Sequence, residues 1–191
     1  MLSEPLQVVA QVVRALDQLD IPYVVGGSLA SSIYGIPRAT QDVDLVAAIK
    51  AEHADPLAAL LEPSFYVDAG MILEAVDRSA SFNIIHLETM FKADVFVMKR
   101  DPWSREEMRR ARTERLEASD GMLAVRFASP EDTLLHKLLW YRLGNEISDR
   151  QWNDIVGILK VQAGRLDNGY LDRWADALDV AGLLARARSA R

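Results

Sequence analysis

The chain has 191 residues, of which half are hydrophobic, and a formal net charge of -6. This size and composition predict one globular domain, with or without a helical extension, and exclude a disordered chain. An acidic chain of this kind is not built for tight non-specific binding to nucleic acids, because each phosphate contact needs a local cation. The lack of cysteine excludes disulfides, thiol catalysis and cysteine-ligated zinc.

The N-terminal segment lacks the basic start of a signal peptide. No apolar run approaches the roughly 18 residues that a helix needs to cross a membrane. From the sequence we therefore expect a soluble, cytoplasmic protein without a membrane partner.

The first half of the chain alternates expected helices and strands. Apolar residues at helical spacing predict a helix over residues 4–19. The apolar run over residues 21–25 predicts a buried strand, which ends in a turn at Gly26 and Gly27. Ser28 is suited to cap a helix over residues 29–34. Further strands are expected at 43–49, 65–67, 82–87 and 93–98, and further helices at 56–61 and 71–78.

The second half is expected to be mainly helical. Ser104 with Glu107 matches a capping box, which predicts a charged helix that runs to about Leu116. Alternating residues over 122–128 predict a last strand. Ser129, with a proline and two acids after it, is a strong helix start. Helices are expected at 129–142, 148–162 and 170–187.

Three aspartates in the expected strands carry the chemistry. Asp42 and Asp44 flank one apolar residue, so their side chains point to the same face of a strand, where they repel unless a cation lies between them. Asp94 lies within an apolar run, where an acid is costly to bury unless it is paired or bound to metal. Oxygen ligands suit Mg²⁺, so the three acids together predict a phosphoryl-transfer metal site. For each acid alone, a solvated strand residue is the commoner explanation.

The turn at Gly26, Gly27 and Ser28 is the second element of the expected site. Glycines let a backbone approach a phosphate closely, and the start of the next helix offers free N–H donors. Taken alone, this turn is more simply an ordinary strand-to-helix connection.

The combination of these elements is more specific. Val24-Val25-Gly26-Gly27-Ser28, followed after thirteen residues by Asp42-Val43-Asp44-Leu45, resembles the signature of the DNA polymerase β-like nucleotidyltransferase superfamily. The stretch from Gly26 to Asp44 is similar to a bacterial branch that includes AbiEii-type toxins. The run from Ser129 to Asp132 with Lys137, and Arg150 with Asp154, also look like that branch.

The resemblance implies an α/β (α+β) nucleotidyltransferase fold with a mixed sheet, helices on one face, and an additional helical half. The core is expected over residues 1–128, with a helical extension over residues 129–191 packed on it. The implied site comprises Mg²⁺ held by the catalytic acids and a nucleoside triphosphate such as ATP. The acids are Asp42, Asp44 and Asp94, and the nucleotide-binding residues are Gly27, Ser28, Arg38, Thr40 and Lys137.

Some of these roles have plain alternatives. If Lys137 does not bind phosphate, it is a solvated lysine on a helix. If Arg38 does not bind nucleotide, it pairs with a local acid. Asp154 is expected to pair with Lys137 or Arg150, or to be a surface acid.

The predicted reaction moves a nucleoside monophosphate from a triphosphate to an acceptor hydroxyl of a tRNA end, a protein or a small molecule such as an antibiotic. Two other classes stay open: a non-catalytic nucleotide-binding or toxin–antitoxin component with an antitoxin partner, and a purely structural protein. A row formed by Arg105, Arg109 and Arg112 on one helix face is a further candidate for contact with a nucleic-acid backbone. The three histidines lack ligand spacing, so a zinc site is not expected.

Overall fold

The computed structural model describes residues 4–40, 42–118 and 121–190, which form two compact units. The sheet unit consists of the described parts of Met1–Gly26 and Thr40–Phe127. The helical unit consists of Gly27–Ala39 together with the described part of Ala128–Arg191. The helix that follows Gly26 therefore belongs with the C-terminal helices, whereas the sequence-based division places it in the first half.

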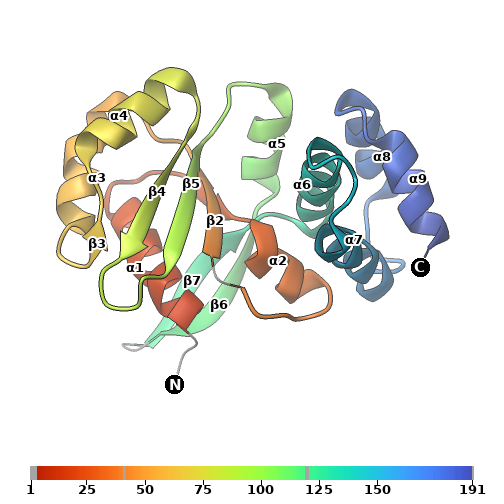
Figure 1. Ribbon diagram of the computed structural model, residues 1–191, viewed down its shortest axis with the longest axis horizontal. Coiled ribbons are helices and arrows are strands. Elements are labelled where there is room, and N and C mark those ends of the chain that lie inside the picture. Colours follow the sequence, from red (N-terminus) through yellow and green to blue (C-terminus); the bar gives the residue numbers. More distant parts are fainter. Residues whose placement is uncertain (1–3, 41, 119–120, 191) are drawn as a thin grey trace. The chain divides into compact units, whose positions relative to one another are not determined.

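The sheet unit contains a seven-stranded mixed sheet within the described residues, in the order β3-β4-β5-β2-β1-β7-β6 (Figure 1). Strand β2 runs parallel to β5 and antiparallel to β1, and β1 runs parallel to β7. The expected mixed sheet is confirmed. Its strands are β1 (Tyr23–Val25), β2 (Asp42–Ala47), β3 (Phe65–Tyr66), β4 (Ser81–His86), β5 (Lys92–Val97), β6 (Arg112–Ala118) and β7 (Gly121–Phe127). Its helices are α1 (Glu4–Gln18), η1 (Ala51–His53), α3 (Ala54–Leu61), α4 (Ala69–Arg78) and α5 (Pro102–Arg110).

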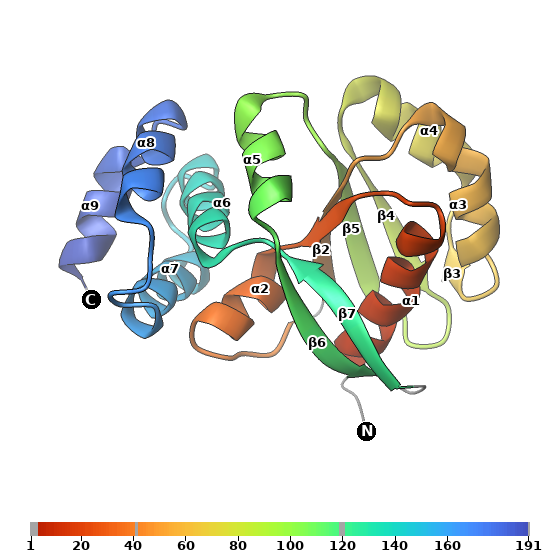
Figure 2. The ribbon, with the colours of Figure 1, turned by 180° about the vertical axis from the view of Figure 1, so that it is seen from behind.

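The two faces of the central strands differ in burial. Helix α1 packs against β2, β6, β7 and α3, and α4 packs against β4 and β5 (Figures 1 and 2). Every second residue of β2 and β5 is buried, while the residues between them are partly exposed. Since side chains alternate along a strand, one face belongs to the core and the other carries the charged residues. The buried set is Val43, Leu45, Ala47, Ala93, Val95 and Val97.

The helical unit consists of α2 (Gly27–Tyr34), α6 (Pro130–Leu143), α7 (Asp149–Val161), α8 (Asn168–Ala177) and α9 (Ala181–Ser189). Helix α2 packs against α6 and α7. The helix start predicted at Ser129 is confirmed, because its side chain accepts a hydrogen bond from the Asp132 N–H and Pro130 opens the helix. Among the described residues, no helix combines the length and apolar character that would let it span a bilayer.

The charged segment after residue 100 differs from the prediction. Helix α5 is capped by Asp101, whose side chain accepts hydrogen bonds from the N–H and hydroxyl of Ser104, and it ends at Arg110. The next residues form β6, which pairs antiparallel with β7 along its whole length. Strand pairing thus overrides the helical pattern of the sequence. The row of arginines expected on one helix face is broken, because Arg112 lies in β6 and Arg109 pairs with Glu106 on α5.

A tight contact in the helical unit yields a first prediction. A Cβ added at Gly35 would lie 2.9 Å from the Ser31 carbonyl oxygen and 3.1 Å from the Ile158 nitrogen. Both neighbours are backbone atoms that cannot turn away. We therefore expect Gly35→Ala to lower the free energy of unfolding by about 1–3 kcal/mol, measured by urea denaturation. The control is Gly182→Ala, because a Cβ there meets nothing within 4 Å. Equal stability of Gly35→Ala and wild type would show that α2 and α7 are not packed this closely.

Candidate functional site

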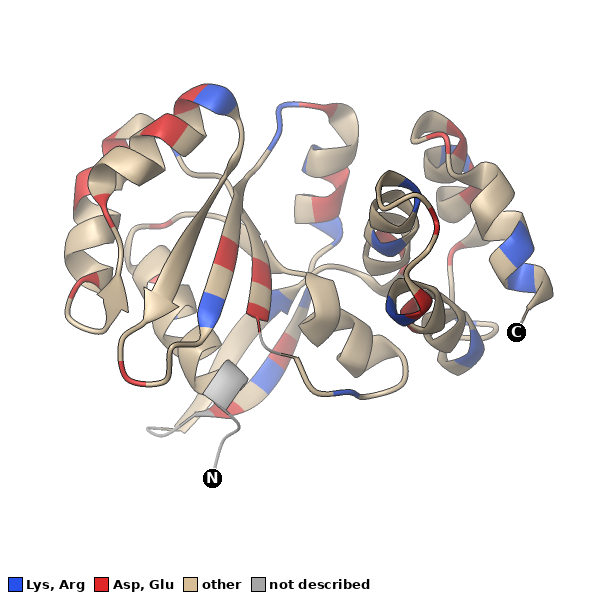
Figure 3. Ribbon diagram, viewed as in Figure 1, with Lys and Arg blue, Asp and Glu red and all other residues tan. Residues whose placement is uncertain are grey.

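The three predicted acids lie on one face of two neighbouring strands. In the parallel pair β2–β5, Asp44 lies opposite Asp94 and Asp42 lies opposite Lys92. Neighbouring strands are about 4.8 Å apart, so side chains on the same face at these positions are within reach of one another. Figure 3 shows acidic segments of β2 and β5 side by side, with a basic residue at the start of β5.

The carboxylates of Asp94 and Asp42 and the backbone of Asp44 each contact a neighbouring residue. The Lys92 Nζ lies 2.8 Å from the Asp94 Oδ2. The Thr40 hydroxyl donates to the Asp42 Oδ1 over 3.0 Å. The N–H of Gly26 donates to the Asp44 carbonyl oxygen over 2.8 Å. Since Gly27 follows Gly26 directly, the glycine turn begins beside the strand that carries two of the acids.

Lys92 is a member of this cluster that the sequence analysis missed. The pKa of Lys92 is raised, first by its hydrogen bond to Asp94 and further by the negative charges of Asp94, Asp42 and Asp44, against an opposing effect of burial. The signal was present in the sequence: Lys92 precedes Asp94 by two residues in an alternating strand and therefore shares its face.

The face of β2 and β5 that carries Asp42, Asp44 and Asp94 is called the acid face below. Its donors are carboxylate oxygens on one side of two adjacent strands, which suit Mg²⁺. Within the described ranges, no group of three or more Asp, Glu, His or Cys side chains is arranged to hold a metal ion. Asp94 contacts Lys92 and Asp42 contacts Thr40 in this arrangement. The metal site of Asp42, Asp44 and Asp94 stays a prediction.

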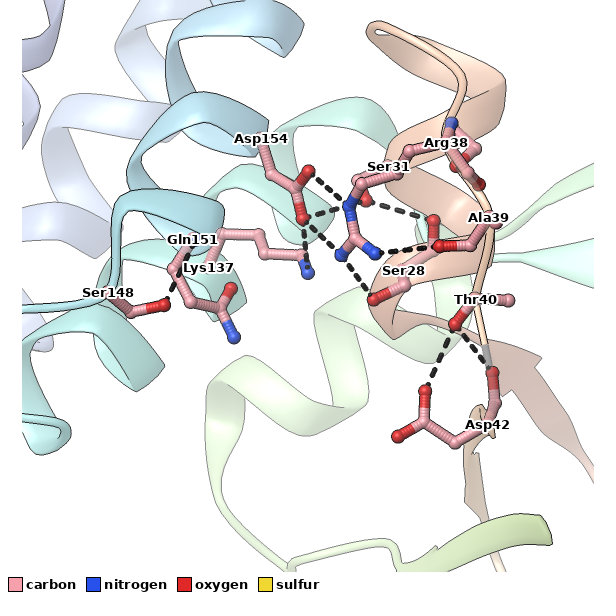
Figure 4. A network of polar contacts seen from close by, with 11 residues as sticks. Ser28, Ser31, Arg38, Ala39, Thr40, Asp42, Lys137, Ser148, Gln151 and Asp154 are labelled. Carbon is pink, nitrogen blue, oxygen red and sulfur yellow. Dashed lines mark hydrogen bonds and ion pairs between the residues drawn. The ribbon is translucent and has the colours of Figure 1, made fainter.

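A second cluster lies in the helical unit, around the carboxylate of Asp154 on α7 (Figure 4). Arg38 approaches this carboxylate with two nitrogens, Nε at 2.8 Å from Oδ1 and Nη2 at 2.8 Å from Oδ2. The Lys137 Nζ lies 2.9 Å from Oδ2. The Arg38 Nη2 also donates to the Ser28 Oγ over 2.6 Å. The buried carboxylate of Asp154 thus joins Arg38 and Lys137 directly, and Arg38 in turn joins Ser28.

The electrostatics of this cluster favour an anion. Burial alone would raise the pKa of Asp154, but hydrogen bonds from Arg38 and Lys137 and their positive charges outweigh it and hold the pKa below its ordinary value. Two cationic side chains share one carboxylate, which leaves these three groups with one positive charge in excess. Ser28 lies in the first turn of α2, where free N–H groups and the helix dipole add to this potential.

Gly27 begins α2 with a φ of 56°, in the left-handed region that side chains disfavour. The backbone conformation of this turn therefore favours glycine, in addition to any close approach of the backbone to a phosphate.

Comparison with solved structures identifies the fold. Neither protein-family models nor curated sequences give a match. An antigenic nucleotidyltransferase-like protein from Paracoccidioides brasiliensis is 20% identical, with a TM-score of 0.52 over 99% of this chain and 94% of the other. The antibiotic-resistance factor ANT(2'')-Ia, in complex with adenylyl-2''-tobramycin, is 15% identical, with a TM-score of 0.50 over 90% of this chain and 95% of the other. The chain has the nucleotidyltransferase fold.

The fold predicted from the glycine turn and the paired acids is therefore confirmed. The resemblance to the AbiEii-type branch stays a prediction from the sequence. At these identities the likeness establishes the nucleotidyltransferase fold alone, so the activity rests on the chain's own residues.

Within this nucleotidyltransferase fold, the predicted site residues fall into two groups. Asp42, Asp44, Asp94 and Thr40 lie in the sheet unit. Gly27, Ser28, Arg38 and Lys137 lie in the helical unit, where Arg38 and Lys137 meet at Asp154 and Ser28 accepts a hydrogen bond from Arg38. The pairing of Asp154 with Lys137 was one of the expected alternatives. Its simultaneous pairing with Arg38, 116 residues away, was not expected.

The lowered pKa of Asp154 predicts a pH dependence of stability. A carboxyl with a depressed pKa stabilises the fold fully above its ordinary value of 3.8, and this contribution is lost as the pH falls through the lower value of the folded state. We therefore expect Asp154→Asn to flatten the decline in unfolding free energy as the pH falls below about 5, measured by urea denaturation. The exposed Asp172 in the same unit serves as control, and Asp172→Asn should keep the wild-type profile. A full wild-type decline in Asp154→Asn would contradict the assignment.

Proposed function

We propose that the protein is a Mg²⁺-dependent nucleotidyltransferase that moves a nucleoside monophosphate from a nucleoside triphosphate to an acceptor hydroxyl. The observation that carries this proposal is the set of three carboxylates, Asp42, Asp44 and Asp94, on one face of two parallel strands. A purely structural role would leave the three acids on one sheet face unexplained.

In this proposal the acid face binds the metal and supplies the general base. Asp42, Asp44 and Asp94 would hold Mg²⁺, which would supply positive charge that offsets the charge building on the phosphate oxygens. Asp94 would also accept the proton of the attacking hydroxyl. Thr40 is a positioning residue, because its hydroxyl fixes the carboxylate of Asp42.

The resemblance assigns the triphosphate to residues of the helical unit. Gly27 and Ser28 offer backbone N–H groups and a hydroxyl at the start of α2. Arg38 and Lys137 offset the phosphate charge, and Asp154 positions both cations. The acceptor oxygen bonds to the α-phosphorus, the bond from that phosphorus to the bridging oxygen breaks, and pyrophosphate leaves.

The acceptor classes to test are a tRNA end, a protein hydroxyl and a small molecule. Because the ANT(2'')-Ia structure contains adenylyl-2''-tobramycin, aminoglycosides belong among the small molecules tested. The use of ATP, which the resemblance implies, and a cytoplasmic location, which the sequence led us to expect, are further parts of the proposal. A non-catalytic toxin–antitoxin component with an antitoxin partner is the alternative to this function.

Thermal unfolding with and without ligands tests the proposed site. Mg²⁺ with a triphosphate should raise the melting temperature of the wild type, because a ligand at about 100 times its Kd adds about 2.7 kcal/mol to stability. Asp42→Asn and Asp44→Asn should lose this response, yet melt at or above wild type in chelator because repulsion is relieved. Asp77→Asn, an exposed acid of α4, should respond as the wild type does. If Asp44→Asn and wild type respond alike, the acids form no metal site.

A further inference from the structure

Lys92 is a cation built into the acid face. It opens β5, lies opposite Asp42 in the strand register, and contacts the Asp94 carboxylate at 2.8 Å. Its side chain is 42% exposed, whereas that of Asp94 is 15% exposed. The lysine therefore approaches Asp94 from the solvent side, on a flexible four-carbon stem that can withdraw.

The contact between Lys92 and Asp94 competes with a metal. While the Asp94 Oδ2 faces the Lys92 ammonium group at 2.8 Å, the lone pair directed at Lys92 is not available to a divalent cation, and the positive charge of Lys92 repels that cation. The three carboxylates carry three negative charges and Lys92 carries one positive charge, so the face keeps two negative charges in excess. Loss of the Lys92 charge would leave three negative charges in excess. This would raise the attraction for a divalent cation, and also the repulsion among the three carboxylates when no metal is bound.

We propose that Lys92 is the resident counter-cation of the acid site, which holds Asp94 in the absence of metal and is displaced when a divalent cation binds. This inference rests on the proposed metal site at Asp42, Asp44 and Asp94. Lys92 accordingly weakens metal binding and stabilises the metal-free state. It is a residue that determines metal affinity and not a ligand.

Titration of the metal-stripped full chain with Mn²⁺, followed by electron paramagnetic resonance of the free ion, measures this effect. Lys92→Gln removes the charge and should bind Mn²⁺ about two- to fivefold more tightly than wild type. Lys92→Arg keeps the charge and should stay close to wild type. Lys50→Gln makes the same charge change at an exposed lysine beyond the end of β2, and should also stay close to wild type.

A second readout uses the unaltered protein. If Lys92 is displaced, Mg²⁺ should increase the rate at which an amine-reactive reagent modifies Lys92, relative to Lys50, as measured by mass spectrometry. This measurement does not depend on the folding of any variant.

The outcomes separate the two proposals. If the wild type binds Mn²⁺ but Lys92→Gln binds it equally or less tightly, Lys92 is not displaced and the metal site stands. The same conclusion follows if the wild type binds Mn²⁺ but Mg²⁺ leaves the modification of Lys92 unchanged. If wild type and Asp44→Asn bind Mn²⁺ equally poorly, the metal site is absent and the inference about Lys92 falls with it.

Discussion

Replacing Asp44 by Asn is expected to lower the rate of nucleotidyl transfer by at least about 100-fold, which corresponds to about 2.7 kcal/mol of transition-state stabilisation. Asp44 lies at the centre of the acid face, directly opposite Asp94 in the strand register and two residues from Asp42. The substitution keeps the size of the side chain and removes one of the charges that attract the metal. The loss should therefore appear in catalysis and not in the fold.

The measurement is the initial rate of label transfer from an α-labelled triphosphate at saturating Mg²⁺. Asp77→Asn removes an equal charge from the exposed surface of α4 and should keep the wild-type rate. Retention of more than about a tenth of the wild-type rate by Asp44→Asn would be incompatible with a role as metal ligand.

The second large effect is expected at Asp154, this time on stability. Asp154→Ala leaves Arg38 and Lys137 without the carboxylate that they share, and the Lys137 side chain is only 4% exposed. Removing one partner of a buried ion pair costs about 3–5 kcal/mol, because the remaining charge stays buried. The partial exposure of Arg38 places the expected loss in the lower part of this range.

Urea denaturation of Asp154→Ala and Asp172→Ala compares a buried with an exposed pair. Asp172 pairs with Arg188 in the same unit, and its side chain is 58% exposed, so its removal should cost at most about 1 kcal/mol. If both variants lose the same amount, Asp154 does not hold a buried cluster.

The first part of the fold was predictable because its signals are local. The alternation of β2 and the turn at Gly26 and Gly27 are visible within a few residues of sequence, and they lead directly to Asp42 and Asp44 on one face. The start of α6 at Ser129 was equally readable, since a cap and a following proline act within one turn.

The errors arise where distant segments decide the outcome. The charged run after α5 has a helical pattern, but β6 forms because β7 is there to pair with it. The partners of Asp154 come from α6 and from the segment after α2, so its double pairing depends on how α2 packs with α6 and α7. No spacing rule predicts such a contact.

The central claim is transfer of the nucleotidyl group, and the position of the transferred label tests it most directly. The protein is incubated with Mg²⁺, a panel of acceptors and a triphosphate labelled at either the α- or the γ-phosphorus. Nucleotidyl transfer predicts that the α-label appears in the acceptor, that the γ-label appears in pyrophosphate, and that Asp44→Asn and chelator abolish both. Appearance of the γ-label in the acceptor, or equal labelling by wild type and Asp44→Asn, would contradict the account.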